Sequence, residues 1–262
     1  MQFAYLNDVA IHYQTIGAPA GKPTIVFANS LGTDFRIWRD VIVRLAGDFA
    51  IVTYDKRGHG LSDIGEAPYS MDDHVSDLEA LLDHLQLRDA IICGLSVGGM
   101  IAQGLYARRK DLVRALILCD TAPKIGDEDG WNGRIKTVAE SGIDALADGV
   151  LERWFTPSFR SAGNGEFAGY RNMLTRTPPE GYTGTCAALR DTDYTREAGL
   201  IGVPTICVVG DQDGSTPPDL VLAMAKAIPG ANYEVISDAG HLPCVEQPET
   251  LVAVMRAFIA TL

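Results

Sequence analysis

The sequence predicts an α/β protein with a mainly parallel central sheet. Short, almost continuous apolar runs recur along the chain, as expected for strands that are covered on both faces. Segments with the three- and four-residue apolar spacing of helices separate several of these runs. One long segment, residues 122–198, lacks such runs and interrupts the alternation. Strands that alternate with helices are typical of right-handed crossovers, which make neighbouring strands parallel.

The strand candidates differ in their expected burial. Residues 9–13 alternate apolar and polar side chains, which predicts a half-exposed strand. Residues 233–236 form a weaker candidate towards the other end of the chain. The continuous apolar runs predict buried strands at residues 24–28, 50–54, 90–93, 115–119 and 205–209.

The clearest helix begins after Ser70, a favourable N-cap residue that is followed three positions later by Asp73. Apolar residues then recur at helical spacing and form one stripe, which consists of Met71, Val75, Leu78, Leu82 and Leu85. Further helices are expected at residues 97–107, 218–228 and 250–262. Residues 122–198 are interpreted as a helical cap, inserted between two parts of one core at residues 1–121 and 199–262.

Composition limits the classes of function. The chain has 262 residues, of which 47% are hydrophobic, enough for one substantial core. With 34 acidic and 22 basic residues the net charge is −12, which argues against nucleic-acid binding. In such a chain an anionic substrate would need a local cation at its site.

Five cysteines, an odd number without metal-ligand spacing, favour reduced and buried thiols in a cytoplasmic protein. The first residues lack the cationic start and apolar run of a signal peptide, and no stretch approaches the ~20 apolar residues of a membrane span. We expect no membrane partner, no metal and no cofactor. The sequence leaves the oligomeric state open.

A candidate nucleophile lies where a buried strand meets a helix. The segment GLSVG, residues 94–98, follows the expected strand and opens the expected helix, with Ser96 at its centre. The GxSxG spacing also occurs by chance, but between a strand and a helix it is typical of a nucleophile elbow. There the serine lies on a strained turn, the glycines permit close backbone approach, and the helix N-terminus faces the reacting group.

A serine nucleophile needs a general base, and five histidines are available. His12 lies in the N-terminal strand and is expected at the surface or at a sheet edge. His74 and His84 flank the apolar stripe and are expected to be solvated. His59 follows a strand and could approach the site, but a glycine-flanked loop of this kind is more often structural. His241 follows the last strand and precedes the last helix, so we predict that it is the base.

The acid that orients the base is expected in the segment VVGDQDGSTPP, residues 208–218. It directly follows a buried strand, so its first residues reach the carboxyl edge of the sheet, where active sites collect. A calcium loop is excluded, because position six counted from Asp211 is Thr216 and position twelve is Leu222. The pattern leaves open whether Asp211 or Asp213 is the acid, the other being a plain turn residue.

The loop NSLGTD, residues 29–34, follows a buried strand and is a candidate for the oxyanion hole. In such sites one backbone N–H comes from the residue after the nucleophile and another from a loop at this position. We assign these donors to Val97 and Leu31. The alternative interpretation is an ordinary glycine-containing turn.

These motifs resemble those of the α/β-hydrolase superfamily, and more narrowly those of the 3-oxoadipate (β-ketoadipate) enol-lactonases. In the family pattern the acid is the fourth residue of Gly-x-x-Asp, which here is Asp213, and Asp211 becomes a loop-capping or solvated neighbour. The matching segments are NSLGTD at 29–34, YDKRGHG at 54–60, CGLSVGGM at 93–100, ERWFTP at 152–157, TPPEGY at 177–182, TPP at 216–218, HL at 241–242 and VEQP at 245–248.

The resemblance implies hydrolysis of 3-oxoadipate enol-lactone, a small anionic lactone of aromatic catabolism, through an acyl-enzyme. The substrate carboxylate needs a cation, and the cap offers Arg134, Arg153 and Arg190. Arg134 is preferred because it follows Trp131 by about one helical turn. The alternative is that each arginine is a solvated surface residue. Trp131 and Trp154 are expected either to line the pocket or to pack the cap onto the core.

Other functions are compatible with the same machinery. A general carboxylesterase, a perhydrolase or a carbon–carbon bond hydrolase would use the same residues on another substrate. Dehalogenases and epoxide hydrolases of this fold use an aspartate nucleophile, so Ser96 disfavours both. A hydrolase-fold receptor would act by ligand-triggered association, and a missing member of the catalytic set would have indicated one.

Overall fold

A computed structural model describes residues 1–17, 21–161 and 163–262. Its strands are β1 (Gln2–Leu6), β2 (Val9–Ile16), β3 (Thr24–Ala28), β4 (Ala50–Tyr54), β5 (Ala90–Leu95), β6 (Val113–Cys119), β7 (Thr205–Gly210) and β8 (Asn232–Ile236). Within the described residues they form one sheet in the order β1-β2-β4-β3-β5-β6-β7-β8. β2 is antiparallel to both β1 and β4, and all other neighbours are parallel.

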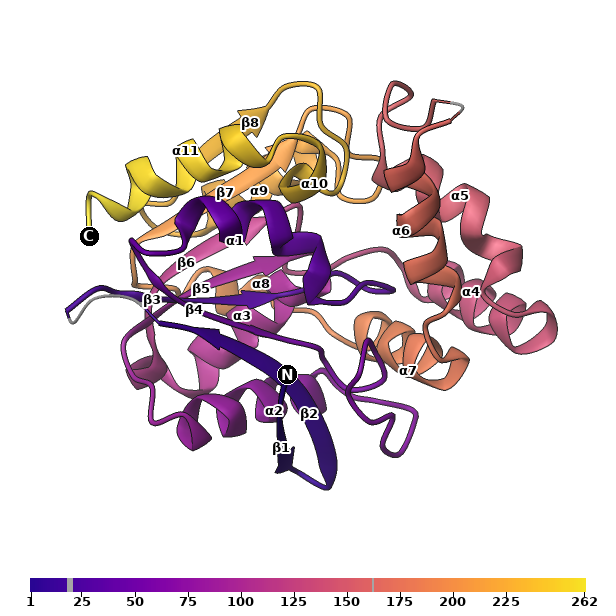
Figure 1. Cartoon of the computed structure of the whole chain (residues 1–262), viewed down its shortest axis with the longest axis horizontal. Coiled ribbons are helices and arrows are strands. Elements are labelled where there is room, and N and C mark those ends of the chain that lie inside the picture. Colours follow the sequence, from indigo (N-terminus) through magenta and orange to yellow (C-terminus); the bar gives the residue numbers. More distant parts are fainter. Residues whose placement is uncertain (18–20, 162) are drawn as a thin grey trace.

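Helices cover the sheet and build a separate group above one of its edges. They are α1 (Arg39–Leu45), α2 (Met71–His84), α3 (Val97–Arg108), α4 (Glu128–Ser141), α5 (Asp144–Trp154), α6 (Gly165–Thr175), α7 (Pro179–Arg190), α8 (Thr195–Ala198), α9 (Pro218–Ala227), α10 (Pro243–Glu246) and α11 (Pro248–Ile259). α1 packs on α11 and α2 packs on α3, and these pairs lie on opposite faces of the sheet (Figure 1). Short 3-10 helices cover Phe35–Trp38 and Lys110–Leu112.

The α/β fold class predicted from the sequence is confirmed. Each expected strand segment lies in a strand, and the weak candidate at residues 233–236 is part of β8. The Ser70 cap is also present, because Ser70 accepts a hydrogen bond from Asp73 N–H and the Asp73 carboxylate accepts one from Ser70 N–H. Such a capping box stabilises a helix by about 1 kcal/mol.

The segment interpreted as a cap holds helices and no strand in its described part. α4 to α7 lie together at one end of the molecule, on the right of Figure 1. α8, by contrast, packs on α3 of the core. The loops that follow the parallel strands reach the edge below α4 to α7, which positions a site between the core and these helices.

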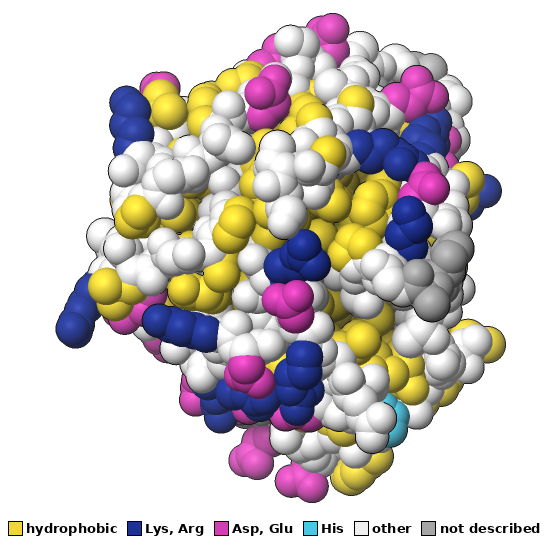
Figure 2. All heavy atoms as spheres, turned by 90° about the vertical axis from the view of Figure 1, so that its left-hand side faces the viewer, with side chains coloured by type: hydrophobic (Ala, Val, Ile, Leu, Met, Phe, Trp, Pro, Cys, Tyr) yellow, Lys and Arg dark blue, Asp and Glu magenta, His cyan; other side chains and the backbone are white. Residues whose placement is uncertain are grey.

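The face on the left-hand side of Figure 1, opposite α4 to α7, shows acidic and basic side chains interspersed, with apolar side chains between them (Figure 2). Ion pairs such as Arg256 with Asp48 and Arg44 with Glu249 join side chains of opposite sign near α11. Exposed pairs of this kind contribute little to stability. Across the described ranges, no helix combines the length and the apolar character that a membrane crossing requires.

Candidate active site

Ser96 lies at the junction of β5 and α3 in a backbone conformation that L-residues rarely adopt, with φ 59° and ψ −120°. The turn is tight because its neighbours are glycines. A Cβ on Gly94 would overlap the backbone of Gly98, and one on Gly98 would overlap the backbone of Ala28. The strained turn brings Ser96 to the wall of a pocket although the residue is only 7% exposed.

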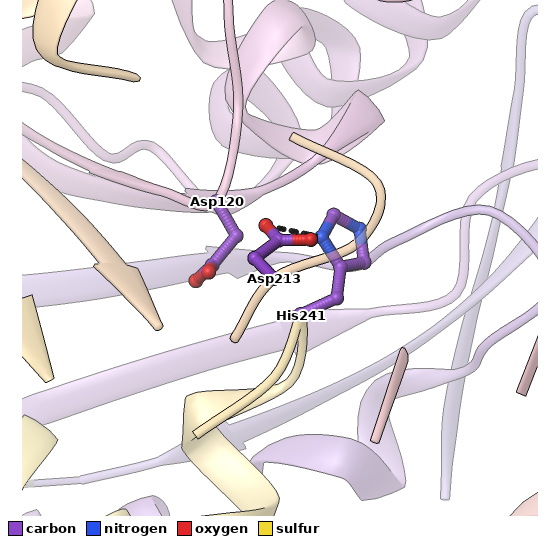
Figure 3. A group of neighbouring side chains, drawn as sticks. All are labelled: Asp120, Asp213 and His241. Carbon is purple, nitrogen blue, oxygen red and sulfur yellow. Dashed lines mark hydrogen bonds and ion pairs between the residues drawn. The ribbon is translucent and has the colours of Figure 1, made fainter. Parts of the chain in front are cut away.

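His241 and Asp213 form a buried pair next to this serine. The imidazole Nδ1 lies 2.8 Å from Asp213 Oδ2, and Figure 3 shows Asp213 between Asp120 and His241. Asp213 also accepts hydrogen bonds from Ser215 N–H, Thr216 N–H and the Thr216 hydroxyl, at 2.7, 3.1 and 2.7 Å. Burial raises the pKa of Asp213, but His241 and these donors outweigh burial and leave it below its ordinary value.

Asp211 has a different role in the same loop. It is exposed, and its Oδ1 accepts a hydrogen bond from Ala239 N–H at 3.2 Å. Its backbone N–H donates to Ile236 O at 2.9 Å, which ties the loop after β7 to the end of β8. The structure therefore brings Asp213, and not Asp211, to the imidazole of His241.

A pocket of about 210 Å³ joins the core to the cap helices. Ser96 and His241 both line it, and among the described residues no hydrogen bond links the serine hydroxyl to the imidazole. Contacts of this kind are often long before substrate binds. The pocket is lined by Ser30, Leu31, Ser96, Ile125, Gly126, Asp127, Gly130, Trp131, Arg134, Val150, Arg153, Trp154, Tyr182, Leu189, Gly214, Ser215 and His241.

The loop after β3 presents Leu31 to this pocket, and α3 presents the N–H of Val97 as its first helical residue. Neither N–H has an acceptor within the ranges that the structure describes. Gly32 follows with φ 72°, a left-handed conformation that favours glycine. Its N–H donates to His59 Nε2 at 3.0 Å, and burial together with Lys56 holds the pKa of His59 well below its ordinary value. His59 thus fixes the loop as a neutral acceptor.

The cap contributes two tryptophans and two arginines to the pocket. Trp131 donates from Nε1 to Ile125 O at 2.7 Å, and the Arg134 guanidinium lies 4.8 Å from the centre of the Trp131 ring. Trp154 lines the pocket beside Arg153. Burial, and then the charge of Arg134, lower the pKa of Arg153.

Arg190, the third cap arginine considered from the sequence, does not line the pocket. Its guanidinium is held by Asp191 at 2.7 Å and by Asn132 at 2.9 Å. The sequence preference for Arg134 over Arg153 is not supported by position, since both line the same pocket. The one-turn spacing from Trp131 favours Arg134 alone. It cannot indicate Arg153, because the pocket is built from several helices.

Hydrogen bonds join the end of α5 to the loops that hold His241 and Asp213. His241 N–H donates to Trp154 O at 2.8 Å, and Gly214 N–H donates to Arg153 O at 3.2 Å. Glu246 extends this link, because it accepts from Gly240 N–H at 2.7 Å and from the Thr156 hydroxyl at 2.6 Å. The last turn of α5 is therefore fastened to both loops of the site.

Asp120, a residue that the sequence motifs do not indicate, is fully buried beside this pair. Its Oδ1 accepts from Gly210 N–H at 2.9 Å, and its Oδ2 has no partner in the described part of the chain. Burial and the charge of Asp213 raise its pKa well above the ordinary value. Asp120 directly follows the buried strand β6. A carboxylate in this position is the same sequence signal that indicates the loop after β7, and it could have identified Asp120.

Asp120, Asp213 and His241 are also residue types that bind metals, and their ligand atoms lie within 4.8 Å of one another. The atoms that a metal would need are engaged, however. His241 Nδ1 and Asp213 Oδ2 bind each other, and two backbone N–H groups bind the other oxygen of Asp213. The raised pKa of Asp120 disfavours the carboxylate form that a metal would bind. This chemistry favours an acid–base pair over a metal site.

The variant Asp120→Asn is expected to raise the free energy of unfolding at pH 7 by at least about 1 kcal/mol. The unfolded chain loses this proton near pH 3.8, whereas the folded chain keeps it to higher pH. Stability of the natural protein therefore falls as pH rises through that window, and asparagine removes the fall while keeping the acceptor for Gly210 N–H. Urea denaturation at pH 4 and pH 7 measures the free energy of unfolding of both proteins. Equal stabilities of the two proteins at both pH values would contradict a protonated Asp120.

Two histidines lie elsewhere than expected. His12 lies on β2 and is buried between the rings of Phe3 and Phe35, because β1 pairs with β2 and β2 is therefore not an edge strand. Its Nδ1 lies 2.8 Å from Asp55 Oδ2. His74 is buried as well, since α7 packs on α2. Burial, with Lys56 and Arg57, lowers the pKa of His74 to about 3. His84 is exposed as expected.

The strand–serine–helix junction, the His–Asp pair and the mixed sheet together define a hydrolase fold. The family model described as alpha/beta hydrolase fold matches residues 23–248, so the chain belongs to the α/β-hydrolase family. Its relatives include 3-oxoadipate enol-lactonase 2 of Acinetobacter baylyi, which is 34% identical over 96% of this chain and 95% of that protein.

Solved structures similar to this chain are also hydrolases. The enol-lactonase from Burkholderia xenovorans superposes with a TM-score of 0.95 and is 34% identical, over 99% of this chain and all of that one. A thermophilic esterase from Thermogutta terrifontis has a TM-score of 0.92 at 26% identity, over 100% of this chain and 99% of that one. The chain is thus a hydrolase of a family whose members differ in substrate.

Proposed function

We propose that this hydrolase opens 3-oxoadipate enol-lactone to 3-oxoadipate, as a step of aromatic catabolism. The observation that carries the proposal is the charge of the pocket. Arg134 and Arg153 line it beside Ser96, and within the described ranges neither forms an ion pair with a carboxylate. The acid of the pocket, Asp127, is bound to the N-terminus of α4 through Gly130 N–H at 2.8 Å. Arg134 donates to the Tyr182 hydroxyl at 3.5 Å, which leaves its charge uncompensated. Two guanidiniums without a carboxylate partner among the described residues suit a substrate that carries a carboxylate.

The proposed reaction uses an acyl-enzyme. His241 removes the proton of Ser96, whose oxygen attacks the lactone carbonyl, and Asp213 orients the imidazole and stabilises its charged form. The N–H groups of Leu31 and Val97 stabilise the oxyanion. Leu31 follows β3, and Ser96 and Val97 follow β5, so the parallel pairing of these two strands brings the three residues to the same edge of the sheet.

Collapse of the tetrahedral intermediate breaks the ring C–O bond. The leaving group is an enolate, a weak base that takes the proton from His241 and becomes the ketone of the product. Water, deprotonated by His241, then attacks the acyl carbonyl. The bond between the acyl carbon and the Ser96 oxygen breaks, and the proton on His241 returns to that oxygen, which frees Ser96 and the product acid. Because the enolate is a good leaving group, breaking the ring C–O bond needs little help from an acid.

The identity of the relatives supports this substrate, since two 3-oxoadipate enol-lactonases of Acinetobacter baylyi are 34% and 33% identical to this chain over almost its whole length. We also propose a cytoplasmic location. It is supported by the five cysteines, all of which are buried and free. A general carboxylesterase is the second candidate, supported by the 26% identical esterase structure.

Wild-type protein is expected to hydrolyse freshly generated enol-lactone with a higher kcat/KM than p-nitrophenyl acetate. The variants Arg134→Met and Arg153→Met are expected to raise KM for the enol-lactone by about tenfold or more, because each removes a charge-assisted contact to the carboxylate. The same variants should leave KM for the uncharged aryl ester within about twofold. Initial rates at several substrate concentrations, followed by absorbance, give these constants.

The matched control is Arg196→Met, which removes an exposed arginine on α8, outside the pocket. It should change neither KM. Aryl-ester activity without enol-lactone activity would favour the carboxylesterase candidate. Equal effects of the pocket variants on both substrates would mean that the arginines shape the pocket and do not bind the carboxylate.

A further inference from the structure

Lys56 is a buried lysine that the proposed reaction does not use. It follows β4 and is 2% exposed. Its Nζ donates to Ser30 O at 2.6 Å and to Thr33 O at 3.2 Å. In the part of the chain that is described, no carboxylate lies within ion-pair distance of it. Lysine is almost never fully buried without a charged partner, so this arrangement calls for a physical reason.

The acceptor Ser30 O belongs to the same peptide unit as Leu31 N–H. In a planar trans peptide the carbonyl oxygen and the amide hydrogen point in opposite directions. A group that fixes Ser30 O on one side therefore fixes the direction of Leu31 N–H on the other. Ser30 O also accepts from the Thr33 hydroxyl at 2.8 Å and from Thr33 N–H at 3.3 Å, so the unit is held from several sides.

We propose that Lys56 is a positioning residue of the oxyanion hole: its ammonium holds Ser30 O so that Leu31 N–H faces the reacting carbonyl. A cation on the carbonyl side also polarises the peptide and makes its N–H a stronger donor. The ammonium stays out of contact with the substrate and acts through the Ser30–Leu31 peptide. The inference rests on the proposed function for the role of Leu31.

The charge of Lys56 depends on pH near neutrality. Burial lowers its pKa to about 7, against the opposing effect of Asp55 and then Asp34. The histidines that face it, His59 in its own loop and His74 on α2, have pKa values well below the ordinary value and about 3, so both are neutral. Lys56 is therefore charged below pH 7 and neutral above it, and the oxyanion donor weakens as pH rises through 7.

The experiment uses p-nitrophenyl acetate, because any ester tests the oxyanion hole whether or not the enol-lactone is the substrate. Lys56→Met is expected to lower kcat by about tenfold or more and to change KM by less than about twofold. Its melting temperature should equal or exceed that of the natural protein, since an apolar side chain replaces a buried cation. The matched control Lys226→Met, at an exposed site on α9, should leave kcat unchanged.

The pH profile gives the readout that a merely structural lysine would not move. The kcat of the natural protein is expected to fall severalfold between pH 6.5 and 8.5, and this fall should be absent in Lys56→Met. Lys56→Gln, a neutral donor, should show an intermediate kcat and no fall. If Lys56→Met does not fold, comparing the pH profile of kcat between the natural protein and Lys56→Gln still tests the positioning role of Lys56.

Two results separate failure of this inference from failure of the proposed function. If Ser96→Ala keeps the ester activity, the proposed function is wrong and Leu31 is no oxyanion donor. If Ser96→Ala is inactive but Lys56→Met keeps a kcat within about twofold and the same pH profile, the positioning role of Lys56 is overturned. An unchanged profile in the Gln variant overturns it equally.

Discussion

Replacement of Ser96 by alanine is expected to lower the hydrolysis of any ester or lactone substrate by about 10⁴-fold or more. In the proposed mechanism the serine oxygen forms the acyl-enzyme, and among the described hydroxyl residues that line the pocket it is Ser96 that directly precedes the N-terminus of α3. What remains would come from the oxyanion donors and substrate binding alone. Initial rates with p-nitrophenyl acetate and with the enol-lactone measure the loss.

The fold should tolerate this change. The left-handed backbone at Ser96 is imposed by β5, α3 and the flanking glycines, and alanine adds no bulk there. The melting temperature is therefore expected to stay within a few degrees of the natural value, which corresponds to less than about 1 kcal/mol. Ser141→Ala, at an exposed residue of α4, is the matched control for loss of a hydroxyl. Residual activity of one tenth in Ser96→Ala would exclude the serine mechanism.

The second large effect concerns the two aspartates after β7. Asp213→Asn is expected to lower kcat by about 10⁴-fold, because an amide nitrogen can donate to His241 Nδ1 and so favour the wrong tautomer of the base. Asp211→Asn should cost less than about threefold. Asp211 is exposed, and among the described residues its side chain accepts a hydrogen bond from Ala239 N–H alone, which an amide oxygen can also accept.

The two variants have the same chemical change and lie in one loop, so each is the control of the other. Both should be compared by kcat with the same ester and by circular dichroism for retention of the fold. Comparable losses at Asp211 and Asp213 would show that the imidazole is not oriented by Asp213.

Most of the fold could be predicted because its strands are buried on both faces and therefore read as continuous apolar runs. β1 could not be predicted, since only Ala4 is buried in it and Phe3 and Tyr5 are exposed. Its position is set by the hairpin with β2 and not by an apolar face. α1 was missed because it has only one short apolar stripe within seven residues.

The site was predictable where backbone geometry demands particular residues. The turn at Ser96 requires glycines on both sides, which makes this residue recognisable in the sequence. His241 could be selected because the base comes last in the chain order Ser, Asp, His of this fold. Side-chain pattern could not choose between Asp211 and Asp213, because both follow β7 and the choice depends on how the turn folds back through Asp213 N–H to Gly210 O. Lys56 could not be recognised, since its partners are backbone carbonyls, which leave no mark in the sequence.

The link between α5 and the catalytic loops bears on how this hydrolase could evolve. His241 N–H and Gly214 N–H are bound by the carbonyl oxygens of Trp154 and Arg153, and every residue type has such an oxygen. Both residues line the pocket, while their main-chain carbonyls hold the loops of Asp213 and His241. Mutation at either position can thus exchange one substrate for another without displacing the catalytic loops, so new specificities lie within reach of single substitutions.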